Sequence, residues 1–188
     1  LRSRVSSQAW KRAMRGVFDG MLDNSKLGKR TKGVVALIAG SIASKRPDLA
    51  ESAEDLGQKV LAAAGIKVKA SDRAGSDKGS LVTDYLIFIA NNEVSKLADL
   101  AIAASDEGKD PSKMKKEVSE IFHGPQAIDI ALFGRMLADA PDLNTDASAQ
   151  VAHAFSIDQI TPEYDYFTAV DDCASEDNAG AAMIDTVG

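Results

Sequence analysis

The sequence predicts an α+β protein, in which a long helical block is followed by a region of extended segments. Apolar residues recur at helical spacing through residues 7–122, and alternating apolar and polar residues follow after residue 127. Aromatic residues make up only 5% of the chain, which disfavours a β-sandwich. Helices and strands that segregate along a chain are typical of the α+β class. The 188 residues fit one large domain or a core with a sizeable insertion.

The helices are expected in a continuous series. Capping residues at positions 6 and 7 precede apolar residues at helical spacing, so a helix should open there after an extended lead-in over residues 2–5. Further helices are expected over residues 29–44, 47–65, 91–104 and 111–122. Gly65 is a candidate C-terminal cap of the helix that starts at Pro47.

The remaining segments are expected to be extended or irregular. Residues 66–80 read as a short alternating piece followed by a polar Gly- and Ser-rich loop, and residues 81–89 fit either a strand or a buried segment. Later segments are expected as a strand (127–134), a short helix (146–155), two extended segments around Pro162 (156–170) and a flexible acidic loop (171–182).

Charge is distributed unevenly along the chain. Residues 1–33 carry nine Lys and Arg against two Asp, a local net charge of +7, whereas the whole chain has a net charge of −6. Because phosphate binding depends on where the cations lie, the overall acidity does not exclude a nucleic-acid partner. The N-terminal segment is therefore the candidate polyanion-binding region.

The N-terminal cations and hydroxyls fall where they can form one strip. Alternate residues of an extended lead-in share a face, residues four apart on a helix share a face, and a helix N-terminus presents free N–H groups to anions. The strip consists of Arg2, Arg4, Ser6, Ser7, Gln8, Lys11 and Arg15. A merely solvated basic face is the alternative, but the coincidence of cations, helix start and missing acids favours polyanion binding.

Two further segments have weaker links to nucleic acid. Arg135 and Met136 follow an expected strand and its Gly, where a cation and a flexible apolar side chain can reach a ligand. Residues 164–170 are rich in Tyr and Phe, which can stack on single-stranded bases, although the residues alone favour a strand that buries one aromatic face.

An enzymatic site is not expected. Asp129, Asp171 and Asp172 are the residues that a metal-dependent nuclease would use, but adjacent Asp residues on a strand point to opposite faces. His123 and His153 have no Cys or Glu at zinc-ligand spacing, and His153 reads as a packed helical residue. We therefore expect no metal and no cofactor.

The compartment is inferred from what the sequence lacks. Cys173 is the only cysteine, so no intrachain disulfide can form. No apolar run approaches the length of a membrane span, and no signal peptide is visible. A cytoplasmic protein without a membrane partner is expected.

Three segments, taken together, resemble one family. They are residues 2–13 (RSRVSSQAWKRA), residues 128–136 (IDIALFGRM) and residues 165–172 (DYFTAVDD), with support from residues 151–154 and 178–180. In order and spacing they are similar to the backbone subunit (CasC) of the type I-E CRISPR surveillance complex Cascade. None of these segments is diagnostic alone.

The resemblance implies a hand-shaped architecture. An RRM-like (ferredoxin-like) palm would carry a large helical insertion called the fingers and a β-hairpin thumb. Residues 1–16 would belong to the palm, residues 17–122 to the fingers, and residues 123–188 to a palm strand, the thumb and an acidic loop. The family's first palm strand would precede Arg2 and its remaining strands would follow Gly188, so the palm is expected to be incomplete and the chain a fragment.

The resemblance also implies a non-catalytic function. Copies of such a subunit polymerise along the CRISPR RNA beside other Cascade subunits, and the guide pairs with target DNA. Guide contacts carry over to Ser6, Ser7, Gln8, Lys11 and Arg15 for phosphates, to Arg135 and Met136, and to Phe167 and Thr168 as a base-stacking wedge.

Two alternatives and one further contact stay open. The chain is alternatively a helical adaptor that binds an acidic partner through its basic strip, or, as a distant third, a nuclease. Lys69, Arg73 and Lys78 in the polar loop are candidates for contact with DNA.

Overall fold

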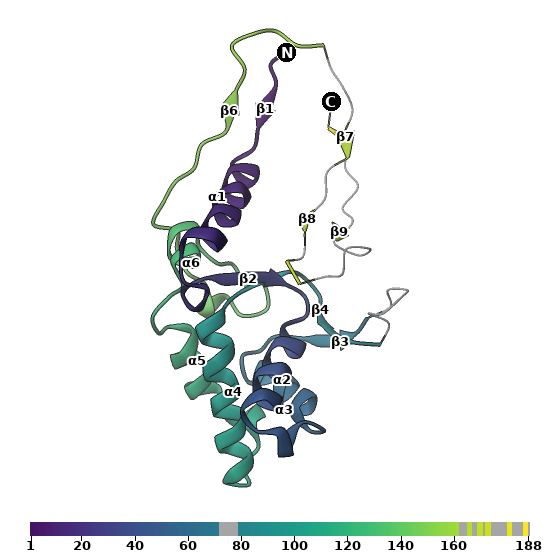
Figure 1. Ribbon diagram of the computed structural model, residues 1–188. Coiled ribbons are helices and arrows are strands. Elements are labelled where there is room, and N and C mark those ends of the chain that lie inside the picture. The colour runs from purple at the N-terminus through teal and green to yellow at the C-terminus, as the bar shows by residue number, and fades with distance from the viewer. Residues whose placement is uncertain are drawn as a thin grey trace.

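The computed structural model describes residues 1–71, 79–161, 165–166, 169–170, 172–173, 180–181 and 186–187, and it confirms the α+β class (Figure 1). The α-helices of these residues are α1 (Ser7–Met21), α2 (Val34–Lys45), α3 (Ala53–Ala63), α4 (Asn91–Asp106), α5 (Lys115–Phe122) and α6 (Ile128–Phe133). Short 3-10 turns are η1 (Asn24–Lys26), η2 (Pro47–Leu49), η3 (Pro111–Lys113) and η4 (Pro141–Leu143).

The strands form two-stranded antiparallel pairs. They are β1 (Arg4–Val5) with β6 (Ala154–Phe155), β2 (Gly28–Thr31) with β5 (Ile87–Ala90), β3 (Val68–Ala70) with β4 (Leu81–Thr83), β7 (Asp165–Tyr166) with β10 (Thr186–Val187), and β8 (Ala169–Val170) with β9 (Gly180–Ala181). No larger sheet occurs in the described part of the chain. The full RRM-like palm therefore stays a prediction.

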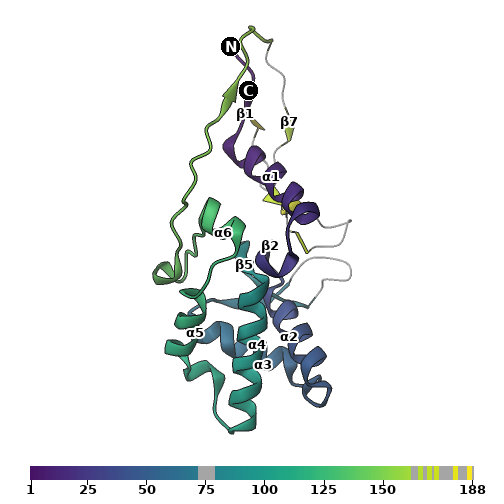
Figure 2. The same cartoon turned by 60° about the vertical axis from the view of Figure 1, so that its left-hand side comes forward.

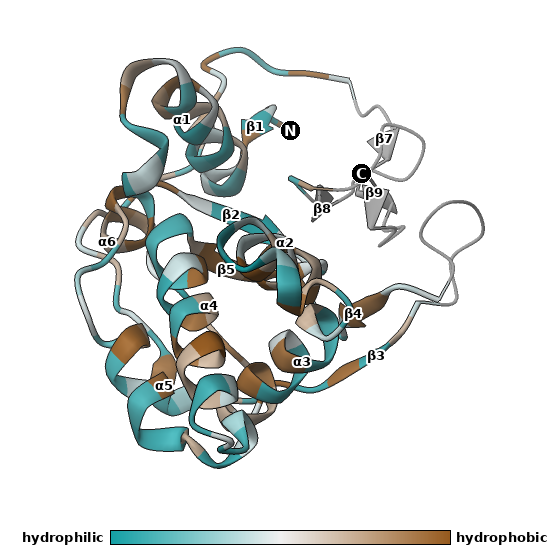
Figure 3. Cartoon of the chain, turned by 60° about the horizontal axis from the view of Figure 1, so that its bottom comes forward, coloured by the Kyte–Doolittle hydropathy of each residue, from teal (hydrophilic) through white to brown (hydrophobic). Residues whose placement is uncertain are grey.

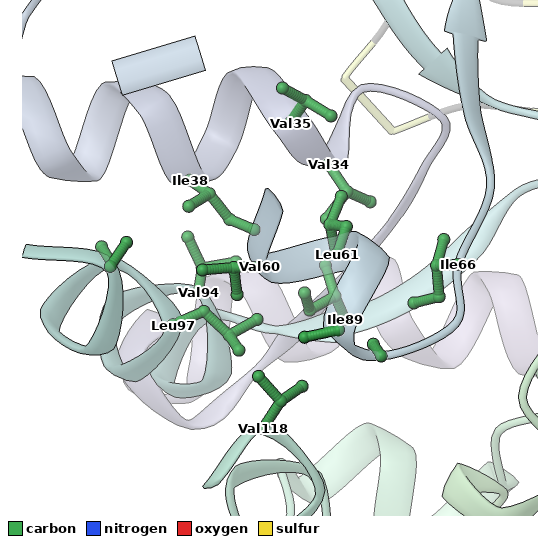
Figure 4. Packing of buried hydrophobic residues seen from close by; sticks show 14 of the residues in the cluster. Val34, Val35, Ile38, Val60, Leu61, Ile66, Ile89, Val94, Leu97 and Val118 are labelled. Carbon is green, nitrogen blue, oxygen red and sulfur yellow. The ribbon is translucent and has the colours of Figure 1, made fainter. Parts of the chain in front are cut away.

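Helices α2 to α5 enclose the hydrophobic core. Val34, Val35, Ile38 and Ile42 of α2 recur at helical spacing and are fully buried. Figure 4 shows Val60 and Leu61 of α3, Val94 and Leu97 of α4 and Val118 of α5 packed against them. In Figure 3, hydrophobic residues gather on α3, α4, α5 and β5 where these elements face one another. Burial of apolar surface is the main stabilising term here.

Helix α1 and the β1–β6 ribbon stand apart from this core. Figures 1 and 2 place them at the opposite end of the molecule from α2–α5, with α6 and β2 between. No residue of α1 is buried. The described residues contain no helix with the length and apolar character needed to cross a bilayer.

Several sequence expectations hold in this fold. The helix that opens at position 6 or 7 is α1, and the helix expected over residues 91–104 is α4. The ambiguous residues 81–89 form β4 and the first part of β5. Gly65 follows α3 with a φ of +77°, a conformation that glycine adopts without strain.

Three expected helices begin later than the sequence indicated. Residues 28–31 form β2 because their backbone pairs with β5, so the helix expected from residue 29 starts only at Val34. A Cβ at Gly28 would lie 2.8 Å from the Phe88 ring, so this strand requires glycine there. The prolines at 47 and 111 each begin a 3-10 turn, and α3 and α5 follow.

Two expectations after residue 127 are wrong. Residues 128–133 form helix α6 rather than a strand. Asp129 in its first turn accepts the Ile130 N–H, and Gly134, with a φ of +78°, follows the last helical residue. Residues 146–153 are irregular rather than helical. Their backbone instead donates to α6, from Ser148 N to Ala131 O and from Ala149 N to Leu132 O, before β6 pairs with β1.

Candidate nucleic-acid interface

The strand–helix junction of β1 and α1 carries most of the predicted phosphate donors. Ser6 is the N-cap of α1, with extended backbone, and its Oγ accepts the Ala9 N–H at 3.1 Å. The first turn of α1 contains no acidic residue. The positive end of the helix dipole is therefore unopposed within α1, which suits an anion.

The lead-in to α1 is held in place by β6. Arg4 lies opposite Phe155 in the ladder, and Ser3 and Ser156 exchange two hydrogen bonds of 3.0 Å each. Both Arg2 and Arg4 are exposed. Strand pairing fixes the backbone while the guanidinium groups stay available to a ligand.

His153 occupies a position next to the start of α1 that the sequence did not suggest. It lies exposed just before β6 rather than packed in a helix, and its Nδ1 accepts the Ser7 N–H at 3.4 Å. Its ring centroid lies 6.4 Å from that of Phe155. The Ser7 amide is thus occupied, and the Ser7 hydroxyl is what remains for a ligand.

Gln8 and Lys11 lie beside the junction. Gln8 is exposed, and Lys11 is half-buried with its Nζ 5.8 Å from the centroid of the Phe133 ring. Phe133 in turn stacks on Phe18, with centroids 6.2 Å apart. Lys11 has no acidic partner among the described residues, so its ammonium is positioned by an aromatic ring and still carries an uncompensated charge.

Arg15 differs from Lys11 although it lies on the same helix face. Its guanidinium forms ion pairs with Asp172 and Asp129, and its Cζ lies 4.6 Å from the centroid of the Phe88 ring. Only 17% of its side chain is exposed. The structure therefore places Arg15 in an intramolecular network rather than at the surface.

Arg135 is a correction to the predicted interface. Its side chain is completely buried, and its Nη1 donates to both carboxylate oxygens of Glu93 at 2.7 and 2.8 Å. Its Nη2 donates to the Phe122 carbonyl at 3.2 Å. To bind a phosphate, the Arg135 guanidinium would have to leave Glu93. The buried Glu93 carboxylate would then have no partner, which costs roughly 3–5 kcal/mol in folding free energy.

The neighbour of Arg135 points outward. Met136 is 77% exposed, so it remains available as an apolar contact for a base. The predicted wedge residues Phe167 and Thr168 lie outside the described residues. Of the predicted base-contacting residues Met136, Phe167 and Thr168, the structure therefore places only Met136.

Of the three candidate cations for contact with DNA, the structure describes only Lys69. Lys69 on β3 forms an ion pair of 2.6 Å with Asp84, whereas Arg73 and Lys78 lie outside the described residues. The hydrogen bond and charge of Lys69, with smaller effects of Lys67 and Lys32, lower the pKa of Asp84 below its ordinary value. Lys69 is thus the cation paired with this carboxylate.

Asp129, one of the three acids of the metal-site alternative, lies buried among hydrogen-bond donors. Asp129 is 2% exposed, and its carboxylate accepts the Gly28 and Ile130 N–H groups and faces Arg15. Within the described ranges, no group of three His, Cys, Asp or Glu residues is placed to hold a metal ion. Asp171 lies outside these ranges. The Asp129 carboxylate is thus engaged by two backbone N–H groups and one cation.

Comparison with known proteins identifies the family. The model of the CT1975-like protein family matches residues 1–188. The chain belongs to this family. No curated protein matches the CT1975-like chain.

Two solved structures are similar to the CT1975-like chain. One is a chain of a "CRISPR RNA-guided surveillance complex, pre-nicking", with 28% identity and a TM-score of 0.68 over 98% of this chain and 52% of that chain. The other is a chain of a "CRISPR RNA-guided surveillance complex", with 27% identity and a TM-score of 0.66 over 82% of this chain and 48% of that chain. The CT1975-like chain therefore spans about half the length of either structure.

Two ion-pair networks of this CT1975-like chain were not predicted from the sequence. One is the buried pair of Glu93 and Arg135, and the other joins Arg15 to Asp129 and Asp172. A signal was present for Asp129, since a single acid inside an apolar run requires a partner once it is buried. Nothing local indicated which cation would supply that partner.

Proposed function

We propose that this chain is part of a non-catalytic subunit that binds CRISPR guide RNA through its phosphates in a CRISPR surveillance complex. Membership of the CT1975-like family and similarity to chains of CRISPR RNA-guided surveillance complexes support this role. The observation that carries it is the junction of β1 and α1. There, Arg2, Arg4 and Lys11 form no ion pair within the described residues, and Gln8 is exposed. The first turn of α1 contains no acidic residue.

The finer assignment is to the backbone subunit of a type I-E Cascade. In this proposal, copies of the subunit line up along the guide in the cytoplasm beside other subunits, and the guide pairs with target DNA. The support is the resemblance carried by residues 2–13, 128–136 and 165–172. An exposed phosphate strip fits such a role, because contacts to the RNA backbone tolerate any guide sequence.

The β3–β4 hairpin is proposed as a second nucleic-acid contact, toward target DNA. Lys69 forms an ion pair with Asp84, and the charges of Lys67 and Lys32 also lower the pKa of that carboxyl. The sequence adds Arg73 and Lys78 to this hairpin. Several cations in one segment are candidate contacts for the phosphates of a nucleic-acid strand.

One observation favours the adaptor alternative. Trp10, Met14, Val17 and Met21 recur at helical spacing along α1 and are between 38% and 74% exposed. An exposed apolar face of this kind is typical of a protein contact. The adaptor would bind an acidic protein and would not distinguish RNA from an acidic polypeptide.

The test is the salt dependence of RNA binding. Fluorescence anisotropy of a labelled single-stranded RNA, titrated with the chain at several salt concentrations, gives the slope of log K against log salt. In Lys11→Ala the slope should become shallower by about 0.7, the value expected for one lost phosphate contact on a single strand. Lys59→Ala is the matched control, because Lys59 lies on α3 and pairs with Asp55.

Three results would count against the proposal. An unchanged slope in Lys11→Ala would remove α1 from the RNA interface. Equal binding of RNA and poly-glutamate competitor would favour the adaptor. Cleavage of RNA that requires Mg²⁺ and is lost in Asp172→Asn would favour the nuclease.

A further inference from the structure

We propose that Arg15 is a positioning residue that holds the segment after β8 against β2, and that it is not a phosphate ligand. The inference deepens the proposed function, on which its RNA-binding readout rests. It changes the assignment of one residue in the predicted phosphate strip. It also gives Asp172 a role that does not involve a metal.

The guanidinium of Arg15 is used on several sides. Its Nη2 donates to Asp172 Oδ2, its Nε lies 3.5 Å from Asp129 Oδ2, and its planar face covers the Phe88 ring at 4.6 Å. The Nε is buried and makes no hydrogen bond, so its contact with Asp129 is purely ionic. A planar fork can serve two carboxylates and a ring at once, whereas a lysine ammonium cannot.

Asp172 joins Arg15 to the edge of β2. Its Oδ2 accepts the Arg30 N–H at 2.8 Å as well as the Arg15 guanidinium. Its own N–H donates to the Arg30 carbonyl at 2.9 Å. Two of these three hydrogen bonds join residue 172 to Arg30 of β2, 142 positions earlier in the sequence, and the third joins it to Arg15 of α1.

Asp129 fixes the other side of Arg15. It accepts the Gly28 N–H at 2.9 Å, which ties it to the first residue of β2, and burial raises the pKa of its carboxyl while Gly28 and Arg15 oppose that effect. The Arg15 guanidinium of α1 therefore contacts β5, α6 and the segment at residue 172, and both of its carboxylate partners are hydrogen-bonded to β2. Figure 1 shows α6 and β2 directly below α1, which agrees with the contacts of Arg15 with Asp129 and of Asp129 with Gly28.

The clamp defines one end of a segment that matters for RNA. At the other end, the Ile160 N–H donates to the Leu1 carbonyl at 3.2 Å. Phe167 and Thr168, the predicted wedge residues, lie between these two anchors in the sequence. Hydrogen bonds to other parts of the chain therefore hold residues 160 and 172, which lie on either side of the predicted wedge residues in the sequence.

A phosphate ligand would be placed differently. A phosphate that approached Arg15 would have to displace Asp172 and would still face the Asp129 carboxylate, so the local charge is unfavourable to a second anion. Lys11, one helical turn earlier, has no such carboxylate beside it. The two cations therefore have separate roles, Lys11 toward the ligand and Arg15 toward the protein.

The substitution that separates the two roles is Arg15→Lys, with Asp172→Ala as the second variant. Arg15→Lys keeps the positive charge that a phosphate ligand needs but loses the fork that reaches two carboxylates. Hydrogen–deuterium exchange monitors the amides of Arg30 and Asp172, whose protection depends on the clamp. Lys11→Arg is the control for a conservative change on the same helix face.

We expect faster exchange at Arg30 and Asp172 in both Arg15→Lys and Asp172→Ala, and no change in Lys11→Arg. RNA affinity should fall in both variants while the slope of log K against log salt stays at the wild-type value. Because Asp172 is exposed, Asp172→Ala tests the clamp even if the Arg15 variant fails to fold.

Two results would overturn the inference. One is wild-type protection at Arg30 and Asp172 in Asp172→Ala. The other is a slope in Arg15→Ala that falls by the same amount of about 0.7 as in Lys11→Ala, which would make Arg15 a phosphate ligand. If no variant and no wild-type chain binds RNA, the proposed function fails, whereas the exchange data still decide whether the clamp exists.

Discussion

The helical core and helix α1 follow opposite rules of exposure. Helices α2 to α5 bury their apolar stripes, and Val34, Val35, Ile38 and Ile42 are fully excluded from water. Helix α1 has an equally regular apolar spacing, yet none of its residues is buried. The comparison shows that amphipathic periodicity predicts a helix reliably, but which face finds a partner is decided by the rest of the structure.

The largest expected effect lies where the core meets α6. Arg135→Ala leaves the buried Glu93 carboxylate without its guanidinium, and we expect a loss of about 3–5 kcal/mol in the free energy of unfolding. Chemical denaturation followed by circular dichroism measures it. A loss below about 1 kcal/mol would mean that water reaches Glu93 and that this junction is looser than the core.

The comparison itself is tested by one truncation in each region. Ile38→Ala removes fully buried methyl groups from α2, and we expect a loss of about 2–5 kcal/mol in the free energy of unfolding. Val17→Ala on α1, where the side chain is 55% exposed, should change it by no more than about 0.5 kcal/mol. Equal losses in the two variants would contradict the distinction between the regions and indicate that α1 is covered in solution.

The smallest effect concerns the β3–β4 hairpin. The pKa of Asp84 should lie below 3.8 because Lys69 stabilises the carboxylate, and Lys69→Met should raise it toward that value. Since the pKa is lowered in the folded state, the associated stability is present above pH 3.8 and is lost as the pH falls through the folded pKa. An NMR titration of the Asp84 carboxyl carbon measures both values. An identical midpoint in the two proteins would show that Lys69 is not its partner in solution.

Local patterns accounted for the elements whose stability is local. The start of α1 at a Ser cap and the long apolar stripe of α4 were both readable, because capping and periodicity act within a few residues. For the residues of helix α6, the sequence pattern predicted a strand instead. Its apolar residues alternate around Asp129, whose hydrogen-bond partner Gly28 lies 101 positions away.

The candidate site divides in the same way. The exposed cations at the β1–α1 junction were predictable, since charge and helix start coincide in a few residues. The internal ion pairs of Arg15 and Arg135 could not be predicted, because their partners are 157 and 42 positions away. The sequence around an arginine does not show whether its side chain faces solvent or a carboxylate.

The pairing of β1 with β6 has a consequence for how this chain tolerates change. Ser3 and Ser156 are hydrogen-bonded although 153 positions separate them, so nearly the whole helical region leaves and returns through adjacent points of one ribbon. The entropic cost of closing such an excursion grows only with the logarithm of its length, by about 0.6 kcal/mol per doubling. Related chains can therefore lengthen or shorten the helical region while the two strands keep their register, which makes it a module that can diversify independently of the ribbon.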